Sequence, residues 1–164
     1  DRKVEGVKKA QEMLAKKKKD MKLFTMIFLS IFLSKSCEGQ TKNDLKTAVL
    51  EYTANTRGFY QKITIKDQMV RVSKDRSSND KPVPVKISDT DWKELVSDFE
   101  TIELESLASL KAPTEKRFYD GAAIADLKVS YKDKVYQTTS FDHGNPPEAI
   151  KKLISKINSF AKEE

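Results

Sequence analysis

The sequence predicts an α+β domain: an antiparallel sheet of about four to five strands, built from two hairpins, with two helices packed on one face. Two stretches alternate apolar and polar residues on either side of a short polar turn, which is typical of hairpins. Two others space their apolar residues three and four apart, which is typical of helices. With no repeat and no low-complexity tract, residues 46–164 are expected to form a single domain.

The first strands are expected between residues 48 and 87. Residues 48–54 (AVLEYTA) fit either a strand or a short helix. Residues 58–66 alternate clearly and, after the turn KDQ, residues 69–73 return, which predicts a hairpin. Residues 82–87 (PVPVKI) alternate too, but their two prolines cannot donate to a ladder. They predict an edge strand or an extended approach to a helix.

A helix is signalled directly after this segment. Ser88 and Asp91 fit a capping box, with acidic residues in the first turn. A stripe of apolar residues then recurs at helical spacing and is expected to face the core: Trp92, Leu95, Val96, Phe99 and Ile102.

The C-terminal part predicts a second hairpin and a closing helix. Residues 122–141 alternate around the turn KDK. In the following DHGNPP, Asn145 is expected to cap, and Pro146 or Pro147 suits the first helical position. The final helix should bury Ile150, Leu153, Ile154, Ile157 and Phe160.

The excess positive charge lies at one end of the chain. The formal charge is +6, but residues 1–37 carry all of the excess, because residues 38–164 contain equal numbers of basic and acidic residues. Nucleic-acid binding needs a broad basic face. We therefore expect no nucleic-acid partner. Residues 1–20, basic and helix-prone, are interpreted as an upstream extension or an expression-derived stretch.

An apolar run precedes the single cysteine. Residues 23–33 contain only two polar residues, and eleven residues of helix span roughly half of the ~30 Å bilayer core. This length suits the apolar region of a secretory signal peptide, with Met21 and Lys22 before it. One cysteine excludes an intramolecular disulfide framework and a multi-cysteine metal site.

Residues 21–36 followed by Cys37 resemble the signal peptide and lipobox of a bacterial lipoprotein. Ser36 fits the box, whereas Lys35 and the early Leu33 depart from it. The resemblance implies that Cys37 is lipidated and becomes the first mature residue, with residues 37–45 as lipidated cysteine and tether. It also implies a membrane anchor, with Glu38 favouring the outer membrane of the cell envelope, facing the periplasm or cell surface.

The residues contain no recognisable catalytic motif and imply no cofactor. The best polar group is Asp120, Asp142 and His143, because antiparallel pairing of the second hairpin brings its two ends together. These three residues could share one surface patch. They could bind a divalent metal weakly, or they could simply shape turns. No metal site is assigned.

Two loops combine a cation with aromatic residues: Arg57 near Phe59, and Arg117 followed by Phe118 and Tyr119. Such loops suit contact with a partner; ordinary packing at strand ends is the alternative. With Asp120, Asp142 and His143, the residues Arg57, Phe118 and Tyr119 form the candidate ligand or partner patch.

The body resembles small uncharacterised envelope lipoproteins of the Bacteroidota, which share the helix signature at Asp89–Leu95 and the closing FDHGxPP at Phe141–Pro147. A weaker resemblance is to emfourin-type inhibitors of thermolysin-like metallopeptidases, through Asp120, Leu127, Val129 and the Pro147 helix. The glycine-rich loop of those inhibitors is reduced here to Gly58.

These observations favour a lipid-anchored, non-enzymatic binding or structural module whose partner is another envelope protein or a peptidase. One alternative is an emfourin-like peptidase inhibitor. A second is a metal-binding or hydrolytic protein that uses Asp120, Asp142 and His143.

Overall fold

The computed structural model describes residues 11–18, 43–77 and 79–161. The chain divides into two units, residues 1–41 and 42–164. Within the first unit, residues 11–18 form an exposed helix. The signal peptide, Cys37 and most of the tether lie outside the described residues and stay predictions. In the described part, none of the helices has the length and apolar character needed to cross a membrane.

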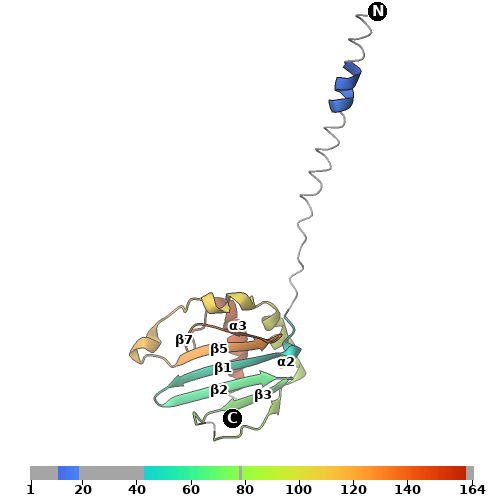
Figure 1. Cartoon of the computed structure of the whole chain (residues 1–164). Helices are drawn as coiled ribbons and strands as arrows, with labels where there is room; N and C mark the ends of the chain where they lie inside the picture. Colours follow the sequence, from blue (N-terminus) through green and yellow to red (C-terminus); the bar gives the residue numbers. More distant parts are fainter. Residues whose placement is uncertain (1–10, 19–42, 78, 162–164) are drawn as a thin grey trace, which may run out of the picture. The chain divides into compact units, whose positions relative to one another are not determined.

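The second unit is built on one antiparallel sheet with the strand order β4-β3-β2-β1-β5-β6, in which β7 also pairs with β5 (Figure 1). The α+β class is therefore confirmed, with more strands than expected. The strands are β1 (Ala48–Thr56), β2 (Phe59–Lys66), β3 (Met69–Ser73), β4 (Val85–Lys86), β5 (Ile124–Tyr131), β6 (Lys134–Gln137) and β7 (Phe141–Asp142).

Two α-helices and four short 3-10 helices complete this unit. They are η1 (Leu45–Thr47), α2 (Asp89–Glu100), η2 (Leu104–Ser109), η3 (Lys116–Tyr119), η4 (Glu148–Ile150) and α3 (Lys151–Ser159). The expected N-cap at Ser88 is confirmed, because the backbone N–H of Asp91 donates to Ser88 Oγ at 3.1 Å, and Ser88 Oγ in turn donates to the Asp91 carboxylate at 2.5 Å.

The structure decides two points that the sequence left open and differs from two other expectations. Residues 48–54 are strand, and β4 is the expected edge strand. The second hairpin returns as two short strands, β6 and β7, instead of one. The expectation that Asn145 caps the last helix is wrong. The Asn145 N–H donates to the Asp142 carbonyl at 2.8 Å, and the residue at the N-cap position of η4 is Pro147.

Helices α2 and α3 cover the same face of the sheet, and the hydrophobic core lies between this face and the helices. Side chains on β1, β2 and β5 alternate between buried and half-buried positions, which sends every second residue into this core. The fully buried residues include Leu50, Tyr52, Ile63, Ile65, Leu127 and Val129 from the sheet, and Leu95, Phe99, Leu153 and Ile157 from the helices.

The other face of the sheet is polar. Glu51 forms ion pairs with Lys62, at 2.7 Å, and with Lys128. Partial burial raises the pKa of Glu51, but the two lysines outweigh it and hold that pKa below its ordinary value. Partial burial raises the pKa of Asp126. The hydrogen bond that Gln137 Nε2 donates to its carboxylate at 3.0 Å lowers this pKa by less, so the pKa stays above its ordinary value.

Candidate functional site

The elements that carry the described candidate residues meet at one end of the sheet, and the strands can be followed in Figure 1. The β1–β2 turn, which contains Arg57, pairs Thr56 with Phe59. On the other side of β1, Asn55 pairs with Ile124 at the start of β5, and Ile124 pairs with Asp142. The loop with η3 comes to the same end, because it contacts β7.

Asp142 is buried beneath the loop between η2 and β5. Its side chain is 0% exposed, and that of its ion-pair partner Arg117 is 7% exposed. The carboxylate accepts hydrogen bonds from Thr114 Oγ1 at 2.6 Å, the Lys116 N–H at 2.7 Å, the Arg117 N–H at 3.0 Å and Arg117 Nη1 at 3.0 Å. The carboxylate is thereby fully engaged in holding one loop.

These hydrogen bonds do for η3 what an N-cap side chain normally does. The residue at the N-cap position, Glu115, makes no side-chain capping bond, and Asp142 accepts the first N–H groups of the turn in its place. Burial raises the pKa of Asp142, but the bonds from Thr114, Arg117 and Lys116 outweigh that effect and hold its pKa well below the ordinary value. Asp142 is therefore an ionised structural group.

Arg117 is fixed as firmly as its partner. Its Nη1 also donates to the Thr114 carbonyl at 2.7 Å, and its Nε donates to Ser140 Oγ at 3.2 Å. The guanidinium lies over the ring of Phe118, with Cζ 4.3 Å from the ring centroid. The buried ion pair thus reaches directly to an aromatic side chain at the surface.

The loop presents two neighbouring aromatic rings to solvent. Phe118 is 70% exposed and Tyr119 is 71% exposed. Asp120 follows in the left-handed conformation, with φ of 59°, and ends the turn. A Cβ on Gly121 would lie 3.1 Å from Cε2 of Tyr119, a tight contact, so any larger residue at this position would push that ring aside by a few tenths of an ångström. We call residues 114–121 the aromatic loop.

His143 belongs to a different environment. Its Nδ1 lies 2.7 Å from the hydroxyl of buried Tyr52, and burial raises the pKa of that hydroxyl to about 12. Its ring also contacts the rings of Tyr52 and Phe59, with centroids 6.0 and 5.4 Å away. The imidazole therefore packs against the β1–β2 hairpin.

The expectation that Asp120, Asp142 and His143 share one surface patch is wrong, and their side chains do not form a common set of ligands. Asp142 is buried among the aromatic loop's N–H groups, Asp120 is exposed at the end of η3, and His143 pairs with Tyr52. Among the described residues, no group of three or more His, Cys, Asp and Glu side chains is placed to hold a metal ion. The residues that are exposed at this end of the sheet are Arg57 and Phe59 at the β1–β2 turn, Ile124 at the start of β5, and Phe118, Tyr119 and Asp120 in the aromatic loop.

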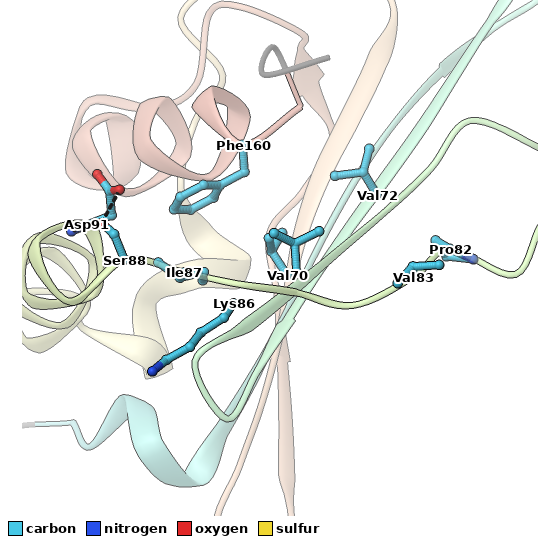
Figure 2. Close-up of a pocket in the computed structure, with 10 residues that line it drawn as sticks. Val70, Val72, Pro82, Val83, Lys86, Ile87, Ser88, Asp91 and Phe160 are labelled. Carbon is cyan, nitrogen blue, oxygen red and sulfur yellow. Dashed lines mark hydrogen bonds between the residues drawn. The ribbon is translucent and has the colours of Figure 1, made fainter.

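A separate hollow of about 500 Å³ lies at the β3–β4 edge of the sheet (Figure 2). Its walls come from Val70 and Val72 on β3, from Phe160 after α3 and from the segment leading to α2. Figure 2 shows the capping pair Ser88 and Asp91 at one end. None of the sequence-predicted site residues lines this hollow.

Sequence reasoning missed Thr114 and Arg117 as partners of Asp142, and Tyr52 as the partner of His143. Each of these contacts joins residues more than 20 positions apart. No local spacing signals them, because only the tertiary structure, including the pairing of β5 with β7, brings these residues next to one another.

No family model, curated protein or solved structure matches the chain. The resemblances to envelope lipoproteins and to emfourin-type inhibitors therefore stay predictions.

Proposed function

We propose that the chain is a lipid-anchored, non-enzymatic module of the bacterial cell envelope that binds a protein partner through the aromatic loop. The anchor is Cys37, and the partner is an outer-membrane or periplasmic protein with an apolar pocket. One observation supports this proposal above the others. All the hydrogen bonds that the Asp142 side chain accepts come from the aromatic loop, and this loop holds two aromatic rings in solvent.

The aromatic loop is pre-organised for binding. A loop that binds a partner loses conformational freedom, and a loop already fixed by a buried ion pair loses less. Aromatic residues supply a large contact area and are frequent among the residues that dominate binding energy. Phe118 and Tyr119 are adjacent, exposed and set on such a fixed loop. An enzymatic role has less support, because the buried carboxylate offers no oxygen to a substrate.

The partner is expected to crosslink to the aromatic loop. The photoreactive analogue p-benzoylphenylalanine would replace Phe118 in one variant and Val135, an equally exposed apolar residue on β6, in another. In native membranes, irradiation should give one discrete adduct from position 118 and none from position 135. No adduct at 118, or the same adducts from both positions, would contradict the proposal.

If the protein is instead an emfourin-like inhibitor, its partner is a peptidase. The photoreactive variant at position 118 tests this alternative as well. A thermolysin-like peptidase should then crosslink at position 118 and be inhibited by the wild-type protein at micromolar concentration. A discrete adduct with a different protein, without inhibition, would keep the binding module and exclude the inhibitor.

A further inference from the structure

We draw no further inference here: the strongest candidate, the mostly apolar hollow of about 500 Å³ at the β3–β4 edge of the sheet, carries none, because nothing in the described part of the chain shows what covers it.

Discussion

Replacing Asp142 with Asn is expected to lower the free energy of unfolding by about 3–5 kcal/mol, the range for breaking a buried ion pair. The substitution leaves Arg117, whose side chain is 7% exposed, without its counter-charge. It also replaces one carboxylate oxygen with an NH2 group, so that either the Lys116 N–H or the Arg117 N–H loses its acceptor. In a domain whose total stability is about 5–15 kcal/mol, this is a large loss. Urea denaturation at pH 7 measures it.

Asp126→Asn is the matched control, with an effect near zero. Asp126 lies on the polar face, where partial burial raises its pKa. The folded state thus disfavours this charge, and its removal should be neutral or slightly stabilising, within about 0.5 kcal/mol. Equal losses from the two variants would contradict the structural role assigned to Asp142.

The contribution of Asp142 to the free energy of unfolding should also change with pH in a defined direction. Its pKa is lower in the folded state than in the unfolded chain, so the folded state favours the ionised form. The stabilisation is complete above the unfolded pKa of about 4 and decreases as pH falls below it toward the folded value. The stability difference between wild type and Asp142→Asn should therefore narrow below about pH 4. A difference that stays constant down to pH 2 would count against the ionised carboxylate.

Replacing both Phe118 and Tyr119 with Ser should abolish most of the binding to the partner captured at position 118. A residue that dominates an interface contributes about 2 kcal/mol or more, so the loss of even one of the two contributions should lower the affinity at least about 30-fold. The free energy of unfolding should hardly change, because these side chains are 70% and 71% exposed. Binding is measured by titrating the purified partner into the full-length protein.

A second double variant controls for the loss of exposed apolar surface. Val83 and Val85 are 78% and 61% exposed and line the hollow at the β3–β4 edge. Their replacement by Ser should leave the affinity for the same partner unchanged. If this variant lost affinity and the aromatic-loop variant retained it, the partner would bind at the β3–β4 edge instead.

The fold could be predicted where its signals are local. Alternation in β2 and β5, the capping pair of Ser88 and Asp91, and the polar turns each depend on neighbouring residues, and all are present in the structure. The turns of the two hairpins hold Asp67 and Asp133 at positive φ, as tight hairpins require. The strand count was less predictable, because β4 and β7 have only two residues each.

The candidate site was predictable in position but not in chemistry. Hairpin pairing correctly places Asp142 and His143 beside the start of β5. The spacing cannot say that neighbouring side chains serve different partners, Asp142 the aromatic loop and His143 the Tyr52 hydroxyl. That distinction depends on which groups become buried together, and burial is set by tertiary packing.

The proposed binding of a partner to the aromatic loop can be measured by hydrogen exchange of the full-length protein, with and without the partner captured at position 118. We expect slower exchange of the backbone amides in residues 114–121 on binding, with no change at β6 (Lys134–Gln137) or at β4 (Val85–Lys86). Protection confined to β4 or β6, with unchanged exchange in the aromatic loop, would contradict it.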